Sequence, residues 1–280
     1  MKKNIKNNFL NEFNLEVKDY LNKNSRDKIS ASLKKQIQFL KKNYLDSGNK
    51  YVIINNFSTQ KEKIIKFSKL FGKTLPQNNS GKKYLIVKPN LKKLRFKKRE
   101  NIKENLRYHE TNLGGSLHSD GPQLPVPPKY VFMCCLNQAK KGGASIIVSM
   151  EKIYNHLKRK NSNVLKTLEK EFFFERRGFG KKIFSKPIFK KNKNIILFRY
   201  LREYIETAYQ KKNKVLDTKR LNALNTLDKL MKKKQFQQID RILQGDLIIL
   251  NNYVMAHGRS RFSLEHNNKK SRRLIRLWIK

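Results

Sequence analysis

The sequence has few acidic residues, few cysteines and no long apolar stretch. Among its 280 residues, Lys and Arg total 65 but Asp and Glu only 21, which gives a formal net charge of +44 at pH 7. No run approaches the roughly 18 consecutive apolar residues of a membrane span, so we expect no transmembrane helix and no membrane partner. The basic start of the chain, at residues 1–21, lacks the apolar core of a signal peptide, and we therefore expect a cytoplasmic protein.

The only two cysteines, Cys134 and Cys135, cannot form a disulfide scaffold. They are adjacent within the apolar run 130–136, and successive side chains of a strand point to opposite faces. We therefore expect two buried thiols in a reducing compartment.

The surplus of basic charge raises the question of a nucleic-acid partner. Of the 65 basic residues, 49 are Lys and 16 are Arg, whereas base recognition and bidentate phosphate binding favour Arg. Asn is also abundant, at 30 residues, and a joint excess of Lys and Asn is typical of A- and T-rich coding sequences. Because the Lys pairs are scattered along the chain, the composition favours a solvated basic surface without a specific nucleic-acid partner.

Short apolar segments separated by turn residues predict a mainly β fold with flanking helices, such as a sandwich or barrel. The expected strands are at 51–57, 83–88, 107–112, 116–119, 130–137, 144–149, 171–176, 185–189, 194–199, 246–251, 253–258 and 272–279. The expected helices are at 30–45, 61–71, 150–159, 163–170 and 217–234. Residues 1–30 are polar, and we expect them to form a partly helical, frayed N-terminal extension.

A possible metal site begins at His118 and Asp120, which would project from the same face of a strand because they are two residues apart. An imidazole and a carboxylate side by side can occupy two positions of a divalent metal. A second histidine from elsewhere would complete the set of two histidines and one carboxylate that favours non-haem Fe(II). His257, at the end of the expected strand 253–258, is the candidate for that third ligand.

Two arginines in the last expected strand suggest an anion site. Arg272 and Arg276 are four residues apart and share one strand face, whereas Arg273 points to the other. A buried arginine needs a carboxylate-like partner, and no acidic residue lies nearby in the sequence. A dicarboxylate cosubstrate would be such a partner.

In these residues and in the segments around them, the chain resembles the taurine dioxygenase/clavaminate synthase-like family of Fe(II)- and 2-oxoglutarate-dependent oxygenases. The resemblance extends from about residue 31 to residue 280. The segments that carry it are LHSDGP (117–122), PPKYVFMCCLNQAKKGGAS (127–145), FRYLREYI (198–205), GDLIILNNYVMAHGRSRF (245–262) and RRLIRLW (272–278).

The resemblance implies a role for individual residues. His118, Asp120 and His257 match the iron ligands, and Arg272 matches the arginine that binds the distal carboxylate of 2-oxoglutarate. Ser145 stands where relatives usually have Thr, so a hydroxyl donor to 2-oxoglutarate is kept. The family's second arginine corresponds to Arg276, which in relatives lies toward the substrate or the 2-oxoglutarate and is a candidate substrate contact. Arg199 is a further candidate substrate contact, although its segment favours packing and loop contacts.

The resemblance also implies a double-stranded β-helix (jelly-roll) core, with residues 31–280 as a single domain. The cofactors would be Fe(II), 2-oxoglutarate as cosubstrate, and O2. The expected reaction is hydroxylation or desaturation of an unactivated carbon of a small, anionic or amino-acid-like substrate, with release of succinate and CO2. Two alternatives stay open: a basic nucleic-acid-binding protein on a non-catalytic jelly roll, and the same oxygenase chemistry on a macromolecule. Residues 90–107 and 176–194 are candidate lid segments.

Overall fold

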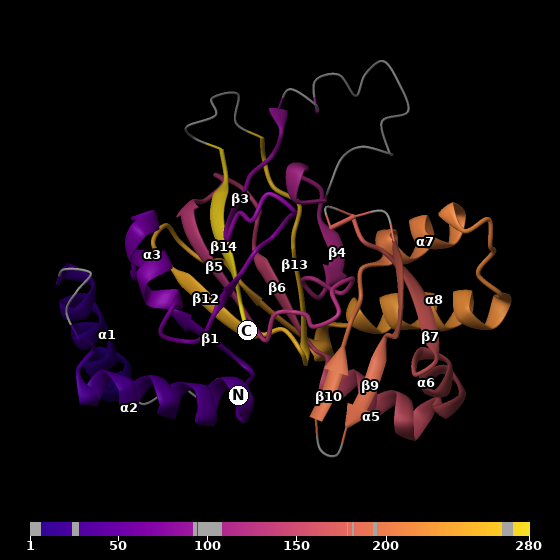
Figure 1. Cartoon of the computed structure of the whole chain (residues 1–280), viewed down its shortest axis with the longest axis horizontal. Helices are drawn as coiled ribbons and strands as arrows, with labels where there is room; N and C mark the ends of the chain where they lie inside the picture. The colour runs from indigo at the N-terminus through magenta and orange to yellow at the C-terminus, as the bar shows by residue number, and fades with distance from the viewer. Residues whose placement is uncertain are drawn as a thin grey trace.

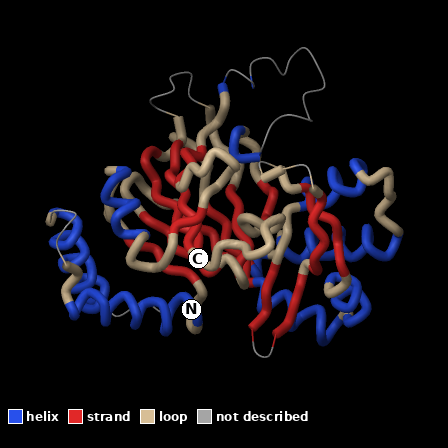
Figure 2. The backbone as a smooth tube through the Cα atoms, viewed as in Figure 1, coloured by secondary structure: helices blue, strands red, loops and turns tan. Residues whose placement is uncertain are grey.

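The computed structural model describes residues 7–23, 28–91, 94, 108–177, 179–180, 182–192, 195–264 and 271–280. Two antiparallel sheets form its centre, and helices lie on either side of them (Figures 1 and 2). The expected lid segment 90–107 lies mostly outside the described residues. In the described part of the chain, no helix is both long enough and apolar enough to cross a membrane.

The larger sheet has the strand order β1-β12-β5-β14-β2, with β3 also paired to β14. These strands are β1 (Tyr51–Ile54), β2 (Thr74–Leu75), β3 (Tyr84–Val87), β5 (Tyr130–Asn137), β12 (Leu247–Asn251) and β14 (Arg273–Ile279). Side chains alternate across it as the pleat requires. On β5, Phe132 and Cys134 face one apolar cluster, while Val131 and Cys135 face the other. The prediction that the two cysteines are buried on opposite faces is confirmed.

The smaller sheet has the order β11-β6-β13-β4. Its strands are β4 (Gly115–His118), β6 (Ser145–Ser149), β11 (Gln237–Asp240) and β13 (Met255–Arg259). Val131 and Leu274 of the larger sheet belong to the same buried cluster as Leu117 and Ala256 of the smaller one. The two sheets therefore share a core.

Helices cover the outer face of the larger sheet at one end of the molecule (Figure 1). They are α1 (Asn7–Asn22), α2 (Ala31–Leu40), which continues as a π-helical turn (Lys41–Asp46), and α3 (Lys61–Ser68). The Ser30 hydroxyl accepts a hydrogen bond from Leu33 N at 3.0 Å and so caps α2. Residues 7–22 of the expected frayed extension form α1, whose Phe13 and Val17 are buried against this layer.

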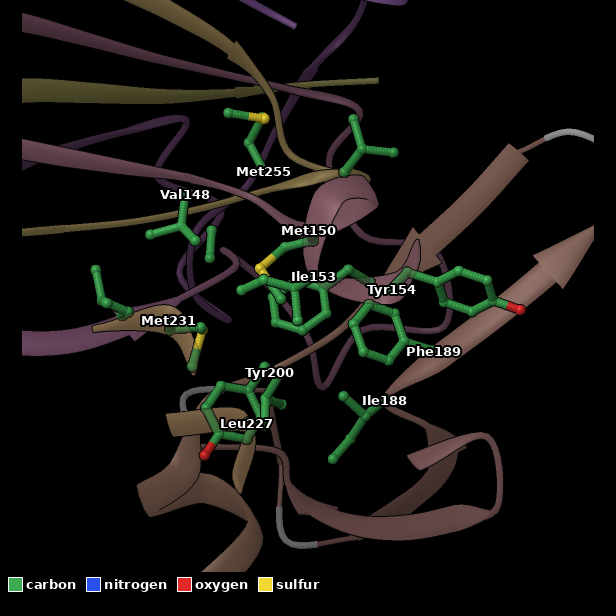
Figure 3. Close-up of a cluster of buried hydrophobic side chains, with 14 of the residues drawn as sticks. Val148, Met150, Ile153, Tyr154, Ile188, Phe189, Tyr200, Leu227, Met231 and Met255 are labelled. Atoms are coloured by element: carbon green, nitrogen blue, oxygen red, sulfur yellow. The ribbon is translucent and has the colours of Figure 1, made fainter. Parts of the chain in front are cut away.

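The other end of the molecule carries the remaining helices and two β-ribbons. They are α5 (Met150–Lys160), α6 (Ser162–Leu168), α7 (Arg202–Lys211) and α8 (Thr218–Met231), with β7 (Glu171–Glu175) paired to β8 (Ile183–Pro187) and β9 (Phe189–Asn192) paired to β10 (Ile195–Phe198). Figure 3 shows how they meet: Ile153 of α5, Leu227 of α8 and Phe189 of β9 pack together with Val148 of β6. The helix α7 was not expected from the sequence, although its buried Ile205, Ala208 and Tyr209 have helical spacing.

Phe67 of α3 is fully buried beside the larger sheet, and its ring lies 4.9 Å from that of Phe57 and 5.2 Å from that of Phe71. We predict that Phe67→Ala lowers the free energy of unfolding by about 3–5 kcal/mol, because it leaves a cavity in a packed aromatic cluster. Urea denaturation followed by circular dichroism measures this, with Phe39→Ala, at a side chain 46% exposed, as the control. Equal stability of the two variants would contradict the packing described here.

Candidate functional site

His118 and His257 lie opposite each other on neighbouring strands. His118 ends β4, His257 is the middle residue of β13, and the antiparallel register pairs the two directly. Their ring centroids are 4.6 Å apart. The pairing of β4 with β13 therefore brings together two imidazoles from distant parts of the chain.

Asp120 follows the end of β4, and a buried asparagine fixes its backbone. Asp120 N donates a hydrogen bond to Asn252 Oδ1 at 2.7 Å, and Asn252 Nδ2 donates to Asp120 O at 2.9 Å. Asn252 Nδ2 also donates to Pro128 O at 3.0 Å. Asn252 lies in the turn between β12 and β13, so the same turn that leads to His257 also positions Asp120.

His118, Asp120 and His257 offer ligand atoms that all lie within 4.8 Å of one another. Asp120 Oδ2 is 3.6 Å from His257 Nε2, and Asp120 Oδ1 is 4.0 Å from His118 Nε2. His118 Nδ1 is 2.6 Å from Ser116 O, and since a carbonyl oxygen only accepts, we assign the proton to Nδ1. The neutral ring then has its lone pair on Nε2, facing the other two residues.

Burial sets the protonation of these three residues. It lowers the pKa of His118, and together with the neighbouring His118 it lowers the pKa of His257 to about 3. Burial is the largest influence and would raise the pKa of Asp120, but the Arg276 guanidinium and the neighbouring His257 and His118 together hold that pKa below its ordinary value. At neutral pH the cluster is therefore two neutral imidazoles and one carboxylate, the donor set that favours non-haem Fe(II).

One carboxylate oxygen of this cluster is buried without a partner. Asp120 Oδ2 is buried and has no hydrogen-bond partner, whereas Asp120 Oδ1 accepts a hydrogen bond from Arg276 Nη1 at 2.6 Å. An unpaired buried carboxylate oxygen is costly, and coordination to a divalent ion would remove that cost. The cluster thus fits a divalent metal in its geometry, its protonation and its unpaired oxygen.

Arg276 extends from β14 to the metal-ligand candidate Asp120. Besides the contact with Asp120, its Nε donates to Gln77 Oε1 at 3.0 Å, and Gln77 Nε2 donates back to Arg276 O at 2.7 Å. Within the described part of the chain, Arg276 Nη2 has no hydrogen-bond partner. The structure therefore places this predicted substrate contact against Asp120, with one amino group still unpaired.

Arg272 is only 4% exposed, and its guanidinium lies over the Phe262 ring. Its Nε donates to Gln138 Oε1 at 3.1 Å, and no carboxylate in the described ranges forms an ion pair with it. Burial lowers the pKa of Arg272 to about 10, so it is charged at neutral pH. Ser145, which the family resemblance pairs with Arg272, is also buried and lines the same cavity.

Gly143 makes room for this arginine. Its φ is +73°, and a Cβ there would lie 2.8 Å from Gln138 Oε1 and 3.0 Å from Arg272 Nε. Any larger residue would clash with both side chains and would also be strained in that backbone conformation.

Sequence reasoning missed Arg259, which is buried and lines the cavity two residues after His257. It donates hydrogen bonds to the carbonyls of Tyr108 at 3.0 Å and Thr111 at 2.6 Å, and also to that of Leu113. These carbonyls turn toward Arg259 instead of toward a neighbouring strand. The strand predicted at 107–112 is therefore wrong, and the chain forms a short 3₁₀ turn, Tyr108–Glu110.

Arg199, the other predicted substrate contact, does not line the cavity. It is buried behind the wall of the cavity, where it donates to the carbonyls of Leu124 at 2.5 Å and Pro125 at 2.9 Å. Burial lowers the pKa of Arg199 to about 10. Its contacts hold the loop that follows Asp120.

A single cavity joins the metal-ligand candidates to Arg272, Ser145 and Arg276. Its walls combine many polar and charged side chains with aromatic and aliphatic ones from Tyr108, Met133, Phe179, Tyr204, Leu274 and Trp278. A concave pocket with convergent polar groups between apolar walls is typical of a small-molecule site.

Comparison with known proteins gives a family match over most of the chain. Residues 29–278 match the model of the family described as taurine catabolism dioxygenase TauD, TfdA family. The chain is 27% identical over 183 residues to FR-33289 synthase of Streptomyces rubellomurinus, covering 63% of this chain and 52% of that protein. It is 28% identical over 155 residues to the taurine hydroxylase-like protein SAT17 of Stachybotrys chartarum, covering 52% and 39%. The matches thus span about half or less of these curated relatives.

Solved structures share the fold. An asparagine oxygenase in complex with Fe(II), 3-hydroxyasparagine and succinate superposes with a TM-score of 0.67 at 12% identity, covering 97% of this chain and 90% of that one. The non-haem iron oxygenase OrfP in complex with Fe and α-ketoglutaric acid gives a TM-score of 0.62 at 13% identity, covering 98% and 90%. The mainly β fold with flanking helices and a jelly-roll core is thereby confirmed.

We predict that Asn252→Ala weakens divalent-metal binding about 10- to 100-fold, because loss of a residue that orients a metal ligand typically lowers metal affinity by that factor. Titration of the metal-free protein with Co(II), followed by absorbance, measures the dissociation constant. Ser68→Ala is the control, because Ser68 is also fully buried but its hydroxyl donates to Ile65 O at 2.8 Å on α3, away from Asp120. Equal metal affinity of the two variants would show that Asn252 does not position the site.

Proposed function

Because the chain belongs to the TauD, TfdA family of dioxygenases, we propose that it is an Fe(II)- and 2-oxoglutarate-dependent enzyme. It hydroxylates or desaturates an unactivated carbon of a small, amino-acid-like substrate and releases succinate and CO2. The observation that carries the proposal is the buried cluster of His118, Asp120 and His257 within one cavity.

In this proposal His118 Nε2, His257 Nε2 and Asp120 Oδ2 would hold the iron at the cavity wall. Bound Fe(II), with 2-oxoglutarate and O2, supplies the oxidising power that an unactivated C–H bond requires. The protein's contribution to the metal is orientation: Ser116 O fixes the His118 tautomer, and Asn252 and Arg276 hold the two ends of Asp120.

Arg272 and Ser145 bind the distal carboxylate of 2-oxoglutarate. Arg272 is a buried cation without a carboxylate partner among the residues that the structure describes, so an incoming carboxylate would satisfy it. Gln138 and Phe262 hold its guanidinium in place, and a fixed donor binds a carboxylate with less loss of side-chain entropy.

Arg276 keeps Asp120 in position and offers its unpaired Nη2 to an anionic group of the substrate. The aromatic residues of the cavity exclude water, which strengthens such polar contacts. The net charge of +44 would draw anionic 2-oxoglutarate and substrate toward the protein.

An amino-acid-like substrate is supported by the solved structures that share the fold. The asparagine oxygenase was crystallised with 3-hydroxyasparagine, and OrfP with a hydroxylated arginine. A small zwitterion also suits a cavity that contains both an arginine with a free amino group and carboxylate and amide oxygens.

We predict that Arg272→Ala raises the concentration of 2-oxoglutarate needed for half-maximal succinate formation at least about tenfold, because a hydrogen-bonded ion pair contributes about 1.5–3 kcal/mol. Succinate is measured in the presence of Fe(II), O2 and a panel of L-amino acids. Arg272→Lys should recover only part of the loss, since an ammonium lacks the planar fork of a guanidinium.

Arg261→Ala, at an exposed neighbouring arginine, is the control and should leave the dependence on 2-oxoglutarate unchanged. If Arg272→Ala and Arg261→Ala behaved alike, Arg272 would not be the 2-oxoglutarate anchor. If the unaltered protein formed no succinate above the level without Fe(II), the proposed activity would be wrong.

A further inference from the structure

Gln123 lines the cavity three residues after Asp120, and its side-chain amide has no visible partner. The residue is only 3% exposed, and its Oε1 is buried without a hydrogen bond. Neither atom of the amide bonds to any residue of the described ranges. An unsatisfied amide oxygen in this position costs about 1–3 kcal/mol, which a hydrogen-bond donor on a bound molecule would recover.

Hydrogen bonds from Arg199 hold the loop that carries Gln123. Arg199 donates to the carbonyl of Pro122 at 3.3 Å, on one side of Gln123, and to that of Leu124 at 2.5 Å, on the other. Leu124 N also donates to Gly121 O at 3.0 Å and closes a turn around the residue. Gln123 is therefore presented to the cavity by a rigid turn, which suits a residue that selects a ligand.

A second acceptor comes from the segment that includes Arg199. Ser119 N donates to Tyr200 O at 2.9 Å, and Tyr200 N donates to Ser119 Oγ at 3.0 Å. These hydrogen bonds hold the segment 119–125 alongside the segment 199–203. Glu203, in the first turn of α7, lines the same cavity from this second segment and is exposed, which places it toward the opening.

The Glu203 carboxylate forms no ion pair or hydrogen bond with the rest of the described chain, although the backbone oxygen of Glu203 accepts a hydrogen bond from Thr207 Oγ1 at 2.7 Å. Asp120 is the other acidic residue that lines the cavity, and it already contacts Arg276. Arg177, also in the cavity wall, partly offsets the rise that burial causes in the pKa of Glu203, but its guanidinium donates to Glu175 Oε2 at 3.0 Å. The cavity therefore has one carboxylate and one amide oxygen without a donor.

We propose that Gln123 and Glu203 form a subsite that binds a nitrogen-bearing cationic group of the substrate, such as the ammonium of an amino acid. This inference rests on the proposed function and specifies its substrate class. Gln123 Oε1 accepts a hydrogen bond from the ammonium inside the cavity, and Glu203 supplies the opposite charge nearer the opening. The cavity then distinguishes an amino acid from a nitrogen-free acid of the same size, because an acid without the amine leaves both acceptors unpaired.

The test is ligand binding to the anaerobic protein loaded with Fe(II) and 2-oxoglutarate, measured by calorimetry. The probes are L-amino acids, each paired with the 2-hydroxy acid of the same side chain. We expect at least one amino acid to bind about tenfold or more tightly than its 2-hydroxy counterpart. Glu203→Gln and the nearly isosteric Gln123→Met should each reduce that preference at least about fivefold, with unchanged affinity for 2-oxoglutarate.

Glu206→Gln is the matched control, because Glu206 lies on the same helix but is bound by Arg202 at 2.6 Å and does not line the cavity. It should keep the full preference. The proposal is overturned if 2-hydroxy acids bind as tightly as amino acids, if no probe binds, or if both variants retain the preference. Failure of 2-oxoglutarate itself to bind would instead refute the proposed function, and this subsite with it.

Discussion

The Asp120 carboxylate is the point at which four parts of the chain meet. Its oxygens face His118 from β4, His257 from β13 and Arg276 from β14, while its peptide group is clamped by Asn252 from the turn after β12. A charged group at this depth is stable only if it is paired. The pairing of the two sheets, the order of their strands and the path of the loop after β4 all act together to supply those partners.

The cavity around this carboxylate combines groups with different chemistry. Arg272 and Ser145 line it together with the metal-ligand candidates, and Gln123 lies on the loop just beyond Asp120. Two buried arginines that do not contact a carboxylate, Arg199 and Arg259, stabilise the surrounding loops by binding backbone carbonyls. Buried arginines therefore have two roles in this fold. Some can bind an anion, and others hold irregular backbone segments by hydrogen bonds to carbonyl groups.

The sequence predicted the central strands and the three metal-ligand candidates well, for separable reasons. Nearly continuous apolar runs in β5, β12 and β14 follow directly from burial on both faces of the sheet, and the motif His-Ser-Asp puts two candidate ligands two residues apart where β4 ends. The turn at 108–110 and the role of Asn252 could not be predicted in the same way. They depend on hydrogen bonds from Arg259 and to Asp120 that join residues more than a hundred positions apart, and no local pattern encodes such contacts. The assignment of residues 31–280 to one domain stays a prediction.

The central claim is that His118, Asp120 and His257 bind Fe(II) and leave room for 2-oxoglutarate beside it. Its most direct test is the absorption spectrum of the protein mixed anaerobically with Fe(II) and 2-oxoglutarate. The account predicts a visible metal-to-ligand charge-transfer band that is lost in His257→Ala and kept in His156→Ala, whose histidine lies outside the cluster. Absence of the band in the unaltered protein would contradict the claim.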